Sequence, residues 1–200
     1  MEVELYKALG ALTKRKEAWR ENIAYVASLL ENNSPRIAAK ALWLLGEMGL
    51  RYPDEIAPHV AAIASFLDSP DDLLRERALN SLGRIGRARF ESINPWWEKM
   101  FGLATDNNPQ VRLAFIWASE NIATNAPEVY VHHMQPFVEL QRDRDDRVRM
   151  EAPEMFRVLG KRQPKSVEPY LNTLLWMAEN DAHPVVRIHS TGAVRAISKN

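Results

Sequence analysis

Histidine side chains are the first candidates for metal chemistry in this sequence, and two of them, His132 and His133, are adjacent. Neighbouring residues on a helix point about 100° apart, so these two imidazoles cannot share one ion. No two histidines stand four residues apart, the spacing that places two ligands on one helical face. The chain has no cysteine, which excludes disulfides, thiolate zinc sites and cysteine nucleophiles. We therefore expect no metal and no cofactor.

Glu151 and Glu154 are the carboxylates whose spacing comes nearest to that of an acid–base pair. A separation of three residues places them on one face of a helix. Such a pair does acid–base work only when burial or mutual repulsion shifts one pKa, and the alternative is a solvated helix face. Because no further residues complete a catalytic site, we assign no catalytic residue and leave enzymatic activity undecided.

Arginine is concentrated in the stretch RERALNSLGRIGRARF, which contains Arg75, Arg77, Arg84, Arg87 and Arg89. A guanidinium group binds phosphate or carboxylate through two parallel hydrogen bonds, so this stretch is a candidate anion-binding patch. The alternative is a solvated helix face whose charge is balanced by nearby acidic residues. The two glycines in the stretch lack the spacing of a phosphate-binding loop.

The overall charge is balanced, with 26 Lys and Arg against 26 Asp and Glu. Nucleic-acid-binding proteins usually carry a basic excess, so this balance argues against a general polyanion partner. The hydrophobic content of 46% is ample for a core. No stretch approaches the roughly 18 apolar residues that a membrane span needs, and the N-terminus lacks the pattern of a secretion signal. We therefore expect a cytoplasmic protein with no membrane partner.

A repeat of about 37 residues supplies the elements that position these side chains. Five segments align without gaps, and their reference positions are Ile37, Leu74, Val111, Val148 and Val186. The residues eight and eleven positions after each reference are mostly apolar, as on the buried face of an amphipathic helix. A second apolar pattern precedes each of these helices, and prolines mark several helix starts, at Pro35, Pro109 and Pro184. Each repeat is therefore predicted to be a helix hairpin.

The predicted fold is an all-α solenoid of about five hairpins with an N-terminal capping helix near residues 2–13, or roughly eleven helices. The hairpins are expected over residues 17–50, 54–88, 92–125, 128–162 and 166–199, within one domain over residues 1–200. Pro58, Pro95 and Pro169 fall in register within the first helices, and kinks are expected at Pro136 and Pro153. Glycines near the ends of the second helices are expected to terminate them: Gly46, Gly49, Gly83, Gly86 and Gly160.

The repeated phrases DNNPQVR, DRDDRVR and DAHPVVR, with ALWLLGEMG and ALNSLGRIG, resemble those of HEAT-repeat proteins, and the likeness covers nearly the whole chain. The resemblance implies a ladder in which a turn aspartate and the arginine after the valine link successive repeats. The matching residues are Arg75, Asp106, Arg112, Asp143, Arg149, Asp181 and Arg187. Arg75 lacks its aspartate, because Ser69 occupies that position. The resemblance also implies that the second helices line a concave face that binds a partner.

The outward positions of the second helices are unusually apolar. Trp43, Asn80 and Trp117 occupy the position six residues after the reference, where a solvated helix normally carries Lys or Glu. A row of exposed apolar residues usually marks a contact site, although these tryptophans could instead pack within the solenoid. The candidate partner-binding residues are Trp43, Arg77, Asn80, Arg84, Leu113, Trp117 and Met150.

These observations favour a non-enzymatic scaffold that binds a protein or peptide through burial of Leu113, Trp117 and Met150, with arginines contacting acidic groups of the partner. The alternative is nucleic-acid binding, because FIWASENIATNAPEV resembles helix phrases of the alkylation-repair DNA glycosylases built from HEAT-like repeats. A third class, modification of a bound protein or pigment as in HEAT-like lyases, has no residue signature here. Self-association stays open.

Overall fold

A computed structural model describes residues 2–199, and its chain divides into two compact units, Met1–Leu103 and Ala104–Asn200. Every regular element in residues 2–199 is helical, so the all-α prediction is confirmed. The expectation of one domain over residues 1–200 stays a prediction. No helix in residues 2–199 is both long and apolar enough to cross a membrane.

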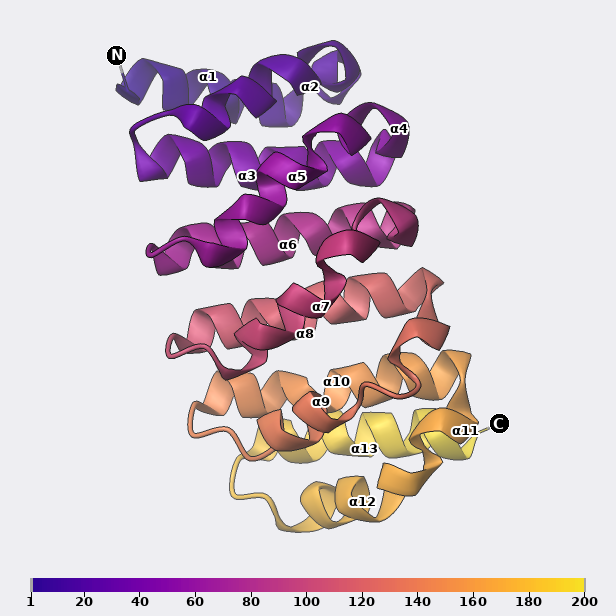
Figure 1. The fold of residues 1–200 in the computed structure, drawn as a ribbon. Coiled ribbons are helices and arrows are strands. Elements are labelled where there is room, and N and C mark those ends of the chain that lie inside the picture. Colours follow the sequence, from indigo (N-terminus) through magenta and orange to yellow (C-terminus); the bar gives the residue numbers. More distant parts are fainter. Residues whose placement is uncertain (1, 200) are drawn as a thin grey trace. The chain divides into compact units, whose positions relative to one another are not determined.

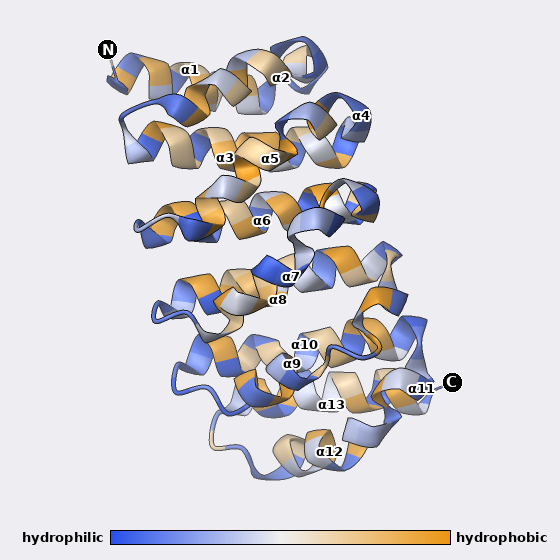
Figure 2. Ribbon diagram, in the orientation of Figure 1, coloured by the Kyte–Doolittle hydropathy of each residue, from blue (hydrophilic) through white to orange (hydrophobic). Residues whose placement is uncertain are grey.

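In the first unit, two long helices, α3 and α6, lie side by side (Figure 1) and pack closely against each other. Shorter helices cover them and connect them. Polar and apolar residues alternate along both long helices, as expected of elements that bury one face (Figure 2). The helices of this unit are α1 (Glu2–Lys14), α2 (Trp19–Ser28), α3 (Pro35–Arg51), α4 (Pro53–Ile56), α5 (Val60–Ser65), α6 (Asp72–Ala88) and α7 (Asn94–Gly102).

In the second unit, α10 packs against both α8 and α13, and α12 packs against α13. Three long helices therefore form one layer, and the shorter helices lie outside it. The helices of this unit are α8 (Pro109–Asn125), α9 (Gln135–Leu140), α10 (Asp146–Arg162), α11 (Pro164–Val167), α12 (Leu171–Asn180) and α13 (Pro184–Ser198). We call α3, α6, α8, α10 and α13 the long helices; they are the predicted second helices of the hairpins.

The starts of the long helices follow the sequence signals closely. Pro35, Pro109 and Pro184 occupy the first turn, as predicted. The residue before each helix accepts a hydrogen bond from a backbone N–H of the first turn, for example Asn108 from Gln110 at 2.8 Å and Asp71 from Leu73 at 2.9 Å. The residues eleven positions after the references are all buried, as predicted: Met48, Ile85, Ile122, Leu159 and Ile197.

In two of the repeats the first helix is divided into two segments, which the hairpin prediction missed. Pro58 lies in a 3-10 helix, Ala57–His59, between α4 and α5, and Pro169 lies in Glu168–Tyr170 between α11 and α12. Proline cannot donate the helical hydrogen bond, and it disfavours the helical conformation of the residue before it. Counted as one bent helix each, these two pairs give the expected eleven helices in residues 2–199. Pro136 does not kink a helix; it lies in the first turn of α9.

The glycines near the helix ends are not terminators, contrary to the prediction. Gly46 and Gly49 lie inside α3, Gly160 lies inside α10, and no glycine in residues 2–199 has a positive φ. A Cβ atom added at Gly46 would lie 2.7 Å from Cα of Ser81 on α6. A Cβ atom at Gly160 would lie 2.8 Å from a side-chain carbon of Ile197. These glycines therefore allow neighbouring long helices to approach at backbone contact.

Candidate functional site

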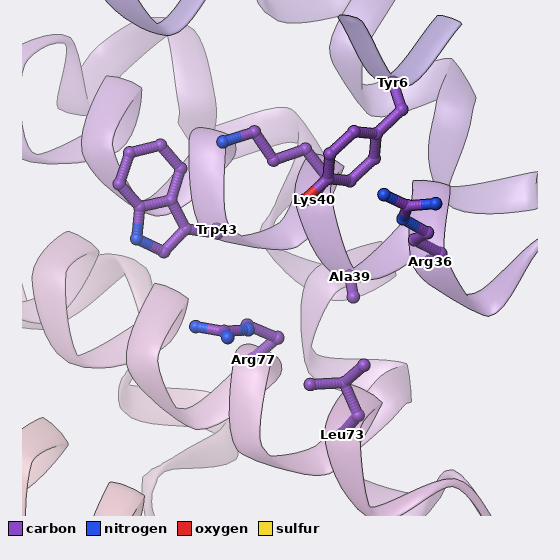
Figure 3. A pocket seen from close by; sticks show the side chains of 7 residues that line it. All are labelled: Tyr6, Arg36, Ala39, Lys40, Trp43, Leu73 and Arg77. Carbon is purple, nitrogen blue, oxygen red and sulfur yellow. The ribbon is translucent and has the colours of Figure 1, made fainter. Parts of the chain in front are cut away.

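In the first unit, a pocket of about 240 Å³ lies over α3 and α6, with one side chain contributed by α1 (Figure 3). Its lining is cationic and aromatic, and it contains two of the predicted partner-binding residues, Trp43 and Arg77. The lining residues are Tyr6, Arg36, Ala39, Lys40, Trp43, Leu73 and Arg77. Tyr6, Arg36 and Lys40 were not among the sequence candidates.

Each aromatic ring of this pocket carries a cation on its face. The Arg36 guanidinium lies 4.0 Å from the ring centroid of Tyr6, and the Lys40 ammonium lies 4.4 Å from that of Trp43. Figure 3 shows Tyr6 beside Arg36, while Lys40 and Arg77 both extend toward the side of the pocket where Trp43 lies. A cation over an aromatic face is attracted by the ring, so each ring favours the position of its cation at the pocket.

The other two candidates on α6 bond to neighbouring residues of this unit. Asn80 donates to Glu76 at 3.4 Å, and Arg84 pairs with Glu47 of α3 at 2.5 Å. Glu76 lies 3.5 Å from Arg77, and burial raises the pKa of its carboxyl, while Arg77 lowers it. Arg84 therefore links α3 to α6, and its charge is largely balanced by Glu47.

In the second unit, Trp117 is exposed on α8, as predicted, with 38% of its surface accessible. Leu113 was expected on the same outward strip, but it is only 5% exposed and belongs to the core. The reason is that α8 buries six consecutive residues, 111–116, so most of its circumference is covered. Met150 is half-buried on α10, where its carbonyl oxygen lies 2.8 Å from Nδ1 of His189.

A carboxylate cluster lies next to Trp117. Glu120, one turn further along α8, is grouped with Glu151 and Glu154 of α10. Burial, reinforced by the charges of these two neighbours, raises the pKa of Glu120 from 4.5 to about 8, and Arg157 opposes the shift. One carboxyl oxygen of Glu120, Oε1, is buried and has no hydrogen-bond partner among the described residues.

The cluster is only partly neutralised. Arg157 pairs with Glu154 through its Nε at 2.5 Å, and Nδ1 of His189 lies 3.7 Å from the same carboxylate. The sequence spacing predicts Glu151 and Glu154 as a pair, but it does not predict that Glu120 joins them. The raised pKa of Glu120 is the kind of shift that acid–base work requires, and the charges of Glu151 and Glu154 beside it can also attract a cation.

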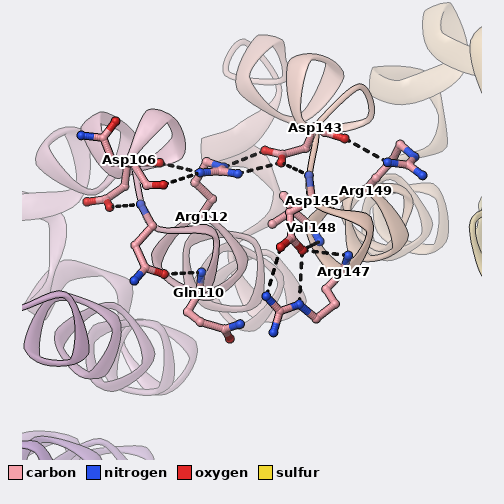
Figure 4. Close-up of polar contacts among 10 residues, drawn as sticks. Asp106, Gln110, Arg112, Asp143, Asp145, Arg147, Val148 and Arg149 are labelled. Atoms are coloured by element: carbon pink, nitrogen blue, oxygen red, sulfur yellow. Dashed lines mark hydrogen bonds and ion pairs between the residues drawn. The ribbon is translucent and has the colours of Figure 1, made fainter.

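The arginine and aspartate of the turns form charged links between successive repeats of the second unit (Figure 4). Arg112, only 6% exposed, donates from Nε and Nη2 to both carboxylate oxygens of Asp143 in the next repeat, each at 2.7 Å. Its Nη1 donates to the backbone carbonyl of Asp106 in its own turn, also at 2.7 Å. Arg112 thus fastens one turn to the next by a bidentate, nearly buried ion pair.

The same pattern continues with weaker geometry. Arg149 lies 3.4 Å from the carboxylate of Asp181 and donates to the carbonyl of Asp143 at 3.0 Å. Arg187 donates to the carbonyl of Asp181 at 2.6 Å. In the first unit, Arg75 donates to the carbonyl of Ser69 at 2.8 Å, the same backbone contact that Arg112 makes with Asp106. These residues serve the packing of repeats.

Within residues 2–199, no three His, Asp or Glu side chains come together in an arrangement that holds a metal ion. The cationic pocket over α3 and α6 and the acidic cluster on α8 and α10 are features with binding chemistry.

No protein-family model matches the sequence, and no curated protein matches it. Solved structures do match. A designed armadillo repeat protein in complex with the peptide (KR)4 has a TM-score of 0.72 at 19% identity, over 98% of this chain and 94% of that chain.

Two further solved structures are similar. One is a computationally designed armadillo repeat protein for modular peptide recognition, with a TM-score of 0.63 at 15% identity, over 96% of this chain and 98% of that chain. The other is an engineered protein with a TM-score of 0.69 at 17% identity, over 98% of this chain and 97% of that chain. The likeness shows a helical solenoid repeat fold, and it does not single out the HEAT type.

Proposed function

We propose that this protein is a scaffold that binds a peptide segment of a partner protein, and that α8 and α10 of the second unit bind a basic side chain of that segment. The observation that carries the proposal is the pairing on α8 of an exposed indole, Trp117, with a buried carboxyl, Glu120, one turn away. Large exposed aromatic side chains are typical of the residues that dominate binding energy at protein interfaces.

A lysine or arginine side chain fits this arrangement chemically. Its methylene groups can lie on the Trp117 ring, while its cationic end approaches the carboxylates of Glu120 and Glu151. The buried, unpartnered oxygen of Glu120 would gain a charge-assisted hydrogen bond. Because a bound cation favours the ionised carboxyl, it would also lower the raised pKa of Glu120.

The structural neighbours support a peptide as the ligand. One of them is solved with the alternating basic peptide (KR)4, and another is designed for modular peptide recognition. At 19% and 15% identity these likenesses concern the fold, so the choice of a basic ligand here depends on the carboxylates of α8 and α10.

Fluorescence anisotropy with labelled (KR)4 peptide tests the proposal. Replacing Trp117 with alanine should raise the Kd at least about tenfold, because the aromatic platform is lost. Trp176→Ala is the matched control: this tryptophan is 61% exposed but lies on α12, outside the layer of long helices, and its loss should leave the Kd unchanged. Absence of (KR)4 binding to the native protein, or equal losses in both variants, would contradict the proposal.

A further inference from the structure

We infer that the pocket formed by Tyr6, Arg36, Lys40, Trp43 and Arg77 in the first unit binds the carboxylate side chain of an acidic peptide residue. The inference gives this pocket a ligand opposite in charge to that of the acidic cluster. It rests on the proposed function only for the peptide nature of the ligand.

The polar groups that line the pocket are hydrogen-bond donors. Two guanidinium groups and an ammonium group have no acceptor capacity, and the Trp43 indole N–H only donates. The Tyr6 hydroxyl can donate as well, and neither it nor the indole N–H has a hydrogen-bond partner within residues 2–199. No carboxylate lines the pocket. A ligand that supplies acceptor oxygens therefore complements this lining.

The positive charge of the pocket is poorly balanced by the protein. Neither Arg36 nor Lys40 forms an ion pair with any residue in 2–199, and each is held instead on an aromatic ring. Arg77 has one carboxylate nearby, that of Glu76, at 3.5 Å. Among the described residues, the three cations of the pocket therefore have only one carboxylate near them, that of Glu76 beside Arg77, and Glu76 does not line the pocket. An anion entering the pocket would meet preorganised charge rather than an existing salt bridge.

Size and surroundings favour a peptide carboxylate over a nucleotide or a nucleic acid. A volume of about 240 Å³ is below the usual range for pockets that enclose a small-molecule ligand, roughly 300 to 1,000 Å³, but it admits one side chain. Ala39 and Leu73 add apolar wall that can contact the methylene groups of a glutamate. The chain also lacks the net basic excess that proteins binding polyanions usually carry.

The test uses a labelled hexaglutamate peptide and anisotropy at low and moderate salt. Lys40→Gln and Arg36→Gln should each raise the Kd about tenfold, the loss expected for one charge-assisted contact. Arg51→Gln is the matched control, because Arg51 lies on the same helix and near a ring, that of Tyr52 at 5.5 Å, but not in the pocket. It removes the same charge and should leave the Kd within about twofold, since a distant exposed charge contributes little.

Three results would overturn the inference: no hexaglutamate binding by the native protein, equal losses in Lys40→Gln and Arg51→Gln, or tighter binding of a DNA duplex that the pocket variants abolish. Circular dichroism melting curves check that all variants remain folded. The (KR)4 assay separates this inference from the proposed function. Binding of (KR)4 without hexaglutamate would refute the pocket alone, and the reverse would refute the basic-peptide proposal alone.

Discussion

Replacing Glu120 with glutamine is expected to stabilise the protein, and by an amount that grows with pH. In the folded state burial holds the pKa of this carboxyl at about 8, against an ordinary value of 4.5. Between these values the unfolded chain loses its proton while the folded chain keeps it, so stability falls as pH rises. Glutamine has the same shape and no charge to bury, and it removes this dependence.

The magnitude follows from the shift. Each pKa unit corresponds to about 1.4 kcal/mol, so ionisation of the unfolded chain costs the native protein about 3 kcal/mol of stability at pH 7 and at most about 5 kcal/mol above pH 8. At pH 5 the cost is below about 1 kcal/mol. Glu120→Gln should recover these amounts relative to the native protein at the same pH.

Urea unfolding followed by circular dichroism at pH 5, 7 and 9 measures the effect. Comparing both proteins at each pH cancels the titration of the groups that do not interact with Glu120. Glu98→Gln serves as the control, because Glu98 is exposed on α7 and its replacement should change stability little at any pH. A gain for Glu120→Gln that is the same at pH 5 and pH 9, or no gain at pH 9, would refute the reasoning.

Three other predictions concern packing, the turn ladder and binding. Gly46→Ala should lower stability by about 1–3 kcal/mol in chemical denaturation, since its methyl group would lie 2.7 Å from a backbone carbon of α6. Gly10→Ala, with nothing within 4 Å, should instead raise stability by about 0.5–1 kcal/mol, and a destabilised Gly10→Ala would contradict this account. Arg112→Ala should cost about 3–5 kcal/mol because it leaves a buried carboxylate unpaired, whereas the exposed Arg147→Ala should cost less than about 1 kcal/mol; equal losses would show that burial of the pair is unimportant. Binding of (KR)4 at pH 7 should release a proton from Glu120, which calorimetry in two buffers of different ionisation enthalpy detects, and proton uptake would exclude the proposed contact.

The helices and their register were predictable because the signals are local. Proline in the first turn and a capping side chain before it specify the start of a long helix, as at Asn108 and Pro109. The sequence also contains a signal for the break at Pro58, because proline restricts the backbone conformation of the residue before it. The break was not predicted because the apolar periodicity of the helix continues through it.

The candidate sites were less predictable because they depend on how neighbouring helices are rotated and spaced. The helical periodicity correctly predicted that Trp117 is exposed. The same periodicity wrongly predicted an outward position for Leu113, because α8 is covered on most sides. Grouping Glu120 with Glu151, or Tyr6 with Arg36, requires contacts between separate helices. Repeat periodicity gives the order of those helices but not which side chains meet across them.

The glycine at position 46 has a consequence for ligand selectivity. The cations Lys40 and Arg77 stand on α3 and α6, the two helices whose separation the Gly46–Ser81 contact sets. A methyl group there would have to move from 2.7 Å to ordinary van der Waals distance, 3.4–4 Å, pushing these helices apart. Such a substitution would widen the pocket without altering any residue that lines it. The core glycine is therefore expected to set the width of the pocket, and substitution at this single position would test whether that width decides which ligands the proposed anion site binds.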